Sequence, residues 1–173
     1  DRRFSAAAVN QKWVSDISYV ATAEGWLYLC VVVDLYSRRV VGWSMGTSLG
    51  TELVLAAFTM AVIRRRPPRG LMFHSDRGTQ YASLAFRKSL ARRGMLQSMS
   101  RKGECWDNAC AETFFKTLKT ELIGRLIYRS REEAKAAIFE YIEVFYNRVR
   151  LHSYLGYFPP AEFEALCGER VAS

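Results

Sequence analysis

The period of the apolar positions changes several times along the chain, which predicts alternating strands and helices. Segments 12–20, 26–34 and 38–45 are rich in Val, Ile, Tyr and Trp and are separated by short turn-like stretches. This pattern is typical of an antiparallel meander of three strands. Segment 51–66 has the i, i+3, i+4 spacing of an amphipathic helix, and 71–74 resembles a short buried strand. A helix between two strands forms a crossover, so the fourth strand should run parallel to an earlier one.

The second half of the chain adds one more strand and several helices. We expect a helix over 83–93, ended by a glycine that favours a left-handed cap, and a fifth strand over 95–99. A polar loop over 100–107 precedes a helix over 108–123, and Ser130-x-x-Glu133 is a capping box that begins a helix reaching about residue 147. After His152 we expect one last short helix at most. The fold class predicted is α/β with a mixed five-stranded sheet.

Composition limits the number of domains and the class of partner. The 173 residues are 50% hydrophobic, which suits one domain with its own core. We expect a basic linker over 1–11, leading from an upstream domain, and a single domain with a helical tail over 12–173. A net charge of +8 favours a polyanionic partner. No apolar run approaches the ~18 residues of a membrane span, and four cysteines without a C-x-x-C pair suggest reduced thiols in the cytoplasm.

Three acidic residues lie where such a fold would gather them. Asp16 interrupts the first strand, Asp76 directly follows the fourth, and Glu112 lies in the first turns of the helix after the fifth. If the first and fourth strands are parallel neighbours, Asp16 and Asp76 converge at one end of the sheet, where α/β proteins usually place their sites. Neighbouring carboxylates repel each other, so either one takes up a proton or a divalent cation binds among them. We favour Mg²⁺ or Mn²⁺, the usual ions of phosphoryl chemistry.

The same residues also allow a purely structural interpretation. Asp16 could cap a turn, Asp76 could open a loop, and Glu112 could favour a helix N-terminus. Asp34 is a useful comparison, because a hairpin centred near residue 23 pairs Asp16 with about residue 30 and Asp34 with about residue 12. Asp34 then lies ~13 Å from Asp16 along the strands, and we expect it to serve the turn at 35–37.

Several motifs in the right order resemble the catalytic core of bacterial insertion-sequence transposases of the IS-three family, which are similar to retroviral integrases. They are W-V-S-D at 13–16, V-V-D-L-Y-S-R at 32–38, H-S-D-R-G-T-Q-Y at 74–81, G-E-C-W-D-N-A-C-A-E-T-F-F-K-T-L-K-T-E at 103–121 and Y-N-R-V-R-L-H-S-Y-L-G-Y at 146–157. The 35 residues between Asp76 and Glu112 match the D-D-35-E spacing of this group. Lys119 stands seven residues after Glu112, where the family has a basic residue.

The resemblance implies an RNase H-like fold, with a five-stranded mixed sheet in the order 3-2-1-4-5 flanked by helices. It implies hydrolysis at the ends of the element, which frees a 3′ hydroxyl, and in-line attack of that hydroxyl on another strand without a covalent enzyme intermediate. By this resemblance Asp16, Asp76 and Glu112 hold Mg²⁺ or Mn²⁺ in a two-metal site. Two ends and a target DNA would be held by a homo-oligomer of the full protein, in the cytoplasm of a bacterium and associated with its nucleoid.

Basic and polar residues around the acids are candidates for DNA contacts. At 100° per residue, Asn108, Glu112, Lys116 and Lys119 share one helix face, next to an apolar stripe. For Lys119 we expect DNA contact, whereas Lys116 is balanced between DNA contact and an ordinary i, i+4 pair with Glu112. The remaining candidates are Arg77 and Gln80 after Asp76, Arg101 and Lys102 before the helix, and Arg148 in the tail.

The aromatic and histidine residues near the motifs have simpler interpretations. Tyr81 either borders the site or belongs to the core, and His74, on a buried strand, should be a core or supporting residue. His152 is expected in a C-terminal patch, structural or in contact with DNA. The first hypothesis for the whole chain is a metal-dependent DNA strand transferase. A nuclease without strand transfer and a non-catalytic DNA-binding module stay as alternatives, because the carboxylates alone do not separate the three.

Overall fold

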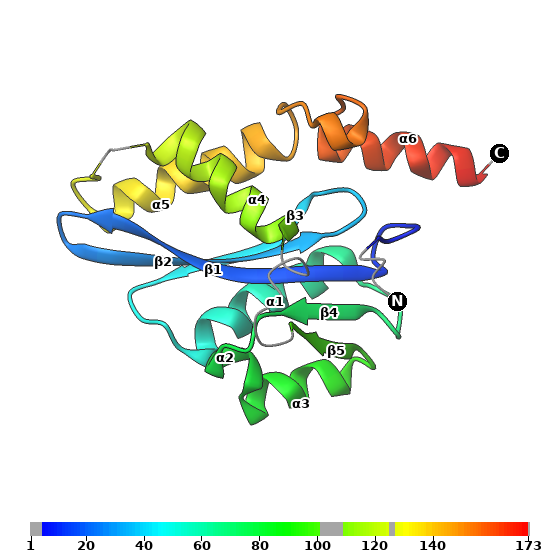
Figure 1. The fold of residues 1–173 in the computed structure, drawn as a ribbon, viewed down its shortest axis with the longest axis horizontal. Coiled ribbons are helices and arrows are strands. Elements are labelled where there is room, and N and C mark those ends of the chain that lie inside the picture. Colours follow the sequence, from blue (N-terminus) through cyan, green and yellow to red (C-terminus); the bar gives the residue numbers. More distant parts are fainter. Residues whose placement is uncertain (1–4, 101–108, 125–126, 173) are drawn as a thin grey trace.

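The computed structural model describes residues 5–100, 109–124 and 127–172 (Figure 1). Five strands form one sheet in the order β3-β2-β1-β4-β5. β1 pairs antiparallel with β2 and β2 with β3, whereas β4 pairs parallel with both β1 and β5. The strands are β1 (Lys12–Thr22), β2 (Gly25–Asp34), β3 (Val40–Gly46), β4 (Met72–Ser75) and β5 (Leu96–Met99). The predicted strand order and mixed sheet are confirmed.

Helices cover both faces of this sheet, with α4 and α5 on one side and α1 and α3 on the other (Figure 1). The first group is α1 (Thr51–Arg65), the short α2 (Thr79–Ala82) and α3 (Leu84–Arg92). The second is α4 (Ala109–Leu118), which continues as a π-helical turn η2 (Lys119–Ile123), and α5 (Arg131–Glu140), which continues as a π-helical turn η3 (Tyr141–Tyr146). The chain ends with a 3₁₀ turn η4 (Ser153–Leu155) and α6 (Pro160–Ala172). Within the described residues, no helix combines the length and apolar character needed to cross a membrane.

Two hydrophobic cores lie on opposite faces of the sheet, because successive side chains of a strand point to opposite sides. On β2, Val31 and Val33 belong to the core under α4 and α5, whereas Cys30 and Val32 belong to the core under α1 and α3. All four are fully buried. A central strand buried on both faces explains why this segment is a continuous apolar run rather than an alternating one.

Gly42 sets how closely α1 packs on β3. A Cβ at this position would lie 2.3 Å from the Ala57 carbonyl oxygen and 2.7 Å from the Ala61 Cβ. Both alanines are fully buried. The helix therefore rests on strand backbone, and only glycine leaves the room for it.

Three local expectations differ from the structure. β3 begins at Val40 rather than at residue 38, since Arg38 adopts a left-handed φ of 60° in the preceding turn. The segment after Asp76 contains the short helix α2, which was not predicted. The expectation of one short C-terminal helix at most is wrong, since α6 has 13 residues. Its Glu164 binds Arg65 (2.8 Å) and Arg39 (2.6 Å) across the fold. Burial alone would raise the pKa of Glu164, but the hydrogen bonds and charges of these partners outweigh it and leave the pKa lowered.

We predict that Gly42→Ala lowers the free energy of unfolding by about 1–3 kcal/mol or more, because α1 must move away from β3. Urea unfolding followed by circular dichroism measures the change. Gly168→Ala is the matched control, since a Cβ on Gly168 in α6 meets nothing within 4 Å. An equal loss of stability in the two variants would contradict this account of Gly42.

Candidate active site

The parallel pairing of β1 with β4 brings Asp16 and Asp76 to the same end of the sheet. Ser15 lies opposite Ser75 in the register, so the next residue on each strand is one of the two acids. Both line one surface pocket of about 220 Å³. We call it the Asp16–Asp76 pocket, and it confirms the predicted convergence of these two side chains.

The loop after Asp76 is shaped by its own side chain and by a buried tyrosine. The Asp76 carboxylate accepts a hydrogen bond from the Gly78 N–H at 2.9 Å, a turn that Asp forms readily. Tyr81 is 1% exposed, and its hydroxyl lies 2.8 Å from the Ser15 hydroxyl beneath β1. Tyr81 is therefore a core residue that also lines the Asp16–Asp76 pocket, and it fixes the position of the loop that carries Asp76.

Glu112 approaches Asp16 from the other side, on the exposed face of α4. Ala111, Phe115 and Leu118 are buried against the sheet, as the predicted apolar stripe requires, and this orientation exposes Glu112. Glu112 and Asp16 line a second surface pocket of about 420 Å³, the Asp16–Glu112 pocket. Asp16 belongs to both pockets and is the residue that connects the other two acids.

The pKa of Asp16 is raised by burial and by its position near the two other acids. Burial raises the pKa of Asp16 to about 6, and the negative charges of Asp76 and Glu112 add to the increase. A hydrogen bond from the Ile17 N–H and the positive charge of Lys119 oppose it. A carboxylate that is costly to ionise and faces two others is an environment in which a bound cation lowers the free energy.

The acids lie as two pairs rather than as one closed group. Among the residues that the structure describes, no three His, Cys, Asp or Glu side chains are close enough together to hold one metal ion. The donors at both pockets are nevertheless carboxylate oxygens, the ligands preferred by Mg²⁺ and Mn²⁺. Their chemistry fits a hard divalent cation, which would have to draw the side chains together.

The predicted DNA-contact residues fall into three groups. Lys116 and Lys119 line the Asp16–Glu112 pocket, and Gln80 lines the Asp16–Asp76 pocket. Arg77 donates to the Ser100 carbonyl oxygen at 2.8 Å beside Asp76. Arg148 lies apart, in a pocket that contains none of the three acids. Arg101, Lys102 and Asn108 lie outside the described residues.

Contacts within the site bear on the open question about Lys116. In the described part of the chain, no ion pair joins Lys116 to Glu112, so the lysine is not held by its helical neighbour. The Lys119 ammonium lies 5.5 Å from the ring centre of Tyr19, which is 55% exposed. Sequence reasoning missed Tyr19, because its place in an aromatic-rich strand did not distinguish it from core residues.

Asp34 and His74 serve the fold. Asp34 pairs with Trp13, three residues before Asp16 on the same strand. It is fully buried and accepts hydrogen bonds from the N–H groups of Asn10, Tyr36 and Ser37 and from the Trp13 indole. It is the turn acid that the hairpin register predicts. His74 is likewise buried, with its ring nitrogens 3.0 and 3.1 Å from the hydroxyls of Ser98 and Ser100.

Comparison with known sequences identifies the family. Residues 6–105 match the model of an integrase core domain, and residues 112–166 match a second integrase core domain model. The chain therefore belongs to the integrase core domain family. The transposase InsF of insertion sequence IS3A from Escherichia coli is 48% identical over 164 residues, covering 95% of this chain and 57% of that protein. A 31 kDa protein of insertion element IS600 from Shigella sonnei is 47% identical over 163 residues, covering 94% and 60%.

These relatives confirm the resemblance to IS-three transposases, and the chain spans a little over half of their length. Solved structures confirm the RNase H-like integrase fold. The integrase catalytic core of HTLV-2, solved with magnesium, superposes with a TM-score of 0.69 at 16% identity, covering 92% of this chain and 99% of that one. A chain in the structure of a simian T-cell lymphotropic virus intasome gives a TM-score of 0.73 at 15% identity, covering 92% of this chain and 56% of that one.

The contrast between Asp34 and Asp16 gives a stability test. We predict that Asp34→Ala lowers the free energy of unfolding by about 3 kcal/mol or more, because buried N–H donors lose their acceptor. Asp16→Ala should change it by less than about 1 kcal/mol, since removing a carboxylate that burial already disfavours costs little. Denaturant unfolding with divalent cations chelated measures both. A larger loss at Asp16 would make that residue structural.

Proposed function

We propose that this chain is the catalytic core of an IS-three type transposase, which cleaves DNA at the ends of an insertion sequence and joins the freed 3′ hydroxyl to another strand. The observation that carries the proposal is the pair of pockets that share Asp16, with Asp76 in one and Glu112 in the other. The similarity to InsF over 95% of the chain supports the substrate class. Such a protein would act on bacterial DNA in the cytoplasm, at the nucleoid.

The acids are the proposed holders of the metal. Asp16, Asp76 and Glu112 would together hold two Mg²⁺ or Mn²⁺ ions, since Asp16 lines both pockets. When bound, such ions activate the attacking oxygen and stabilise the leaving one. The magnesium in the HTLV-2 integrase core supports this choice of cation for the fold.

The surroundings of the acids are suited to a DNA backbone. Lys116 and Lys119 add positive charge beside Glu112. The exposed ring of Tyr19, which lines the Asp16–Asp76 pocket, lies 5.5 Å from the Lys119 ammonium. Gln80 and Arg77 flank Asp76 on the other side. We propose that these residues position a phosphate near the acids, whereas Arg101, Lys102, Asn108 and Arg148 stay candidates on sequence grounds alone. Pairing of two ends would require a homo-oligomer of the full protein, a proposal supported by the intasome with similar fold.

Strand transfer and plain hydrolysis use the same carboxylates, so the product separates them. The test is a Mn²⁺-dependent joining assay on a branched DNA that already pairs a donor end with its target, which relaxes the need for end recognition by other parts of the protein. We predict a joined strand with the unmodified chain, and a loss of at least a hundredfold with Asp16→Asn or Glu112→Gln. Both variants keep the side-chain size and remove one charge.

The control is Glu132→Gln on α5, an 81% exposed acid that pairs only with Lys135 among the described residues. It should leave joining unchanged. Glu112→Gln should keep its thermal stability and its salt-sensitive DNA binding. Metal-dependent cleavage without joining would favour the nuclease, and joining that survives Glu112→Gln would overturn the assignment of the acids.

Lys119 gives a second, independent prediction. If its ammonium contacts a phosphate, Lys119→Gln should weaken DNA binding by a similar factor for all sequences and lower the slope of log K against log salt by about one. Fluorescence anisotropy at several salt concentrations measures the slope. Lys135→Gln on α5 removes the same charge away from the acids and should leave the slope unchanged.

A further inference from the structure

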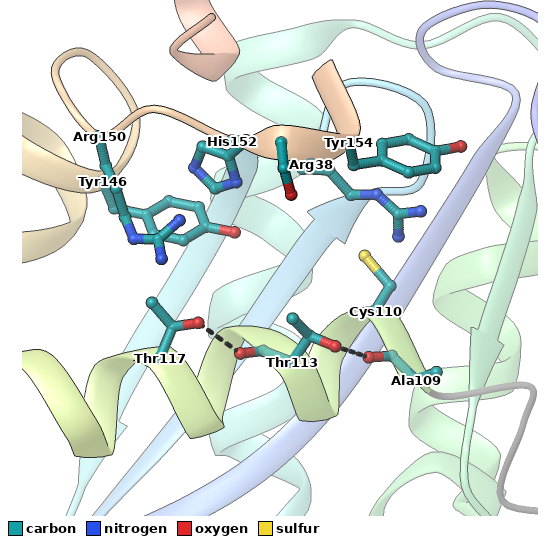
Figure 2. A pocket seen from close by; sticks show the side chains of 10 residues that line it. Arg38, Ala109, Cys110, Thr113, Thr117, Tyr146, Arg150, His152 and Tyr154 are labelled. Atoms are coloured by element: carbon teal, nitrogen blue, oxygen red, sulfur yellow. Dashed lines mark hydrogen bonds between the residues drawn. The ribbon is translucent and has the colours of Figure 1, made fainter. Parts of the chain in front are cut away.

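A third cavity, of about 350 Å³, lies between α4 and the segment after η3 (Figure 2). None of Asp16, Asp76 and Glu112 lines it. Its walls come from distant parts of the chain, and its polar side chains include those of Arg38, Thr113, Thr117, Arg150, His152 and Tyr154. We call it the Arg38–His152 cavity. It contains two arginines and no acidic lining residue.

The Arg38 side chain lines this cavity and, among the described residues, pairs with no carboxylate. Its guanidinium carbon lies 3.9 Å from the ring centre of Tyr154, and Cys110 lines the same cavity. The left-handed φ of 60° that displaces the start of β3 belongs to this residue. A guanidinium oriented by stacking, with donors to spare, is suited to an anionic ligand.

His152 supplies a buried polar atom that lacks a partner. The residue is 9% exposed, and its Nε2 is the one buried side-chain nitrogen or oxygen of the described residues with no hydrogen bond. The ring stands edge-on to the Tyr146 ring, with a distance of 4.8 Å between the ring centres. Buried polar atoms nearly always find a partner, so an orphan beside a cavity indicates a ligand.

The charges around His152 make the cavity positive. Arg150 forms an ion pair with Glu121 at 2.8 Å, so its charge is compensated. The Arg38 charge has no such partner among the described residues. Burial and the positive charge of Arg150 lower the pKa of His152 to about 4, while Glu121 and the Tyr146 backbone oppose the decrease. The titratable groups that face the ring are those of Arg38, Cys110, Glu121, Tyr146, Arg150 and Tyr154. An anion in the cavity would offset the Arg38 charge, so the ring could accept a proton and donate from Nε2.

We propose that the Arg38–His152 cavity is a phosphate-binding site, in which the Arg38 guanidinium and the His152 Nε2 both donate to one phosphate group. Phosphate oxygens match a forked guanidinium donor, and the cavity is large enough for a phosphate with part of the group it is attached to. The hydroxyls of Thr113 and Thr117 already donate to the carbonyls of Ala109 and Thr113 along α4, so they are left as acceptors at the cavity wall (Figure 2).

The position of the cavity suggests where the phosphate comes from. Thr113 directly follows Glu112, so the cavity adjoins the helix face that carries the acids. An α-helix is about 10–12 Å wide, a width that a duplex strand crosses in about three phosphates. A DNA strand that leaves the acids over α4 would reach the cavity. This choice of DNA as source rests on the proposed function, whereas the phosphate site itself requires neither metal nor strand transfer.

The test is NMR of the two histidine rings during a titration with inorganic phosphate, at constant ionic strength set with chloride. Because the chain has only two histidines, His74 is an internal control. We expect the His152 resonances to shift saturably and the pKa of His152 to rise in phosphate, while His74 stays unchanged. Arg38→Gln should weaken phosphate binding at least tenfold.

Arg87→Gln is the matched control, since Arg87 is exposed on α3, across the sheet from the cavity, and its loss changes the net charge by the same amount. It should leave phosphate binding unchanged. His152→Phe keeps an aromatic ring against Tyr146 but lacks the nitrogen, so phosphate should no longer raise its melting temperature. This variant keeps the test decisive if Arg38→Gln folds poorly.

Three results would overturn the proposal: no saturable change of His152 at tens of millimolar phosphate, an equal shift of His74, or equal weakening by Arg87→Gln. A second titration identifies the source. Branched DNA that displaces phosphate from His152 would assign the site to the DNA backbone. Phosphate that stays bound in the presence of DNA would assign it to a free phosphate compound. Neither result depends on whether the chain joins strands.

Discussion

The parallel pairing of β1 with β4 is the constraint on which the rest of the site depends. It arises because the chain crosses from the three-stranded meander over α1 before it returns to the sheet, and the register sets Ser15 against Ser75. Two acids separated by 59 residues of sequence then emerge at one edge. Gly42 allows α1 to lie directly on β3, and the Tyr81 hydroxyl beneath Ser15 fixes the loop after β4. Packing on one face of the sheet therefore determines electrostatics at its edge.

The sheet alone provides only two of the three acids, and α4 adds the third from the opposite layer. Its buried residues belong to the core under α4 and α5, which is distinct from the core that holds α1 and α3. The distance between Glu112 and Asp76 thus depends on how two separately packed layers sit across the sheet. This separation explains why the acids occupy two pockets that share Asp16 rather than one closed cluster. A cation attracted to all three would act against little steric resistance, because Asp76 and Glu112 are both exposed.

The strand order came from the family resemblance, whereas hydrophobic period and crossover rules were sufficient to predict the five strands, the mixed sheet and the convergence of Asp16 with Asp76. These features depend on local pattern and on chain geometry, which the sequence displays directly. The length of α6 was not predictable in this way, since the helix is tied down by Glu164 binding Arg39 and Arg65 more than 95 residues away. Tyr19 and the partners of His152 were missed for the same reason. Their roles depend on which side chains meet in space, and no periodicity encodes that.

Groups of opposite charge gather on two sides of α4. The side facing β1 and β4 gathers carboxylates, of which burial and the neighbouring charges make Asp16 costly to ionise, and the side facing the η3 segment gathers guanidinium and imidazole groups. Each side is less stable alone than it would be with its complement, a cation on the first and an anion on the second. A nucleic acid strand with bound divalent ions carries both complements in one ligand. Such a strand, bound across α4, would therefore neutralise the unpaired charges on both sides of the helix in one binding event.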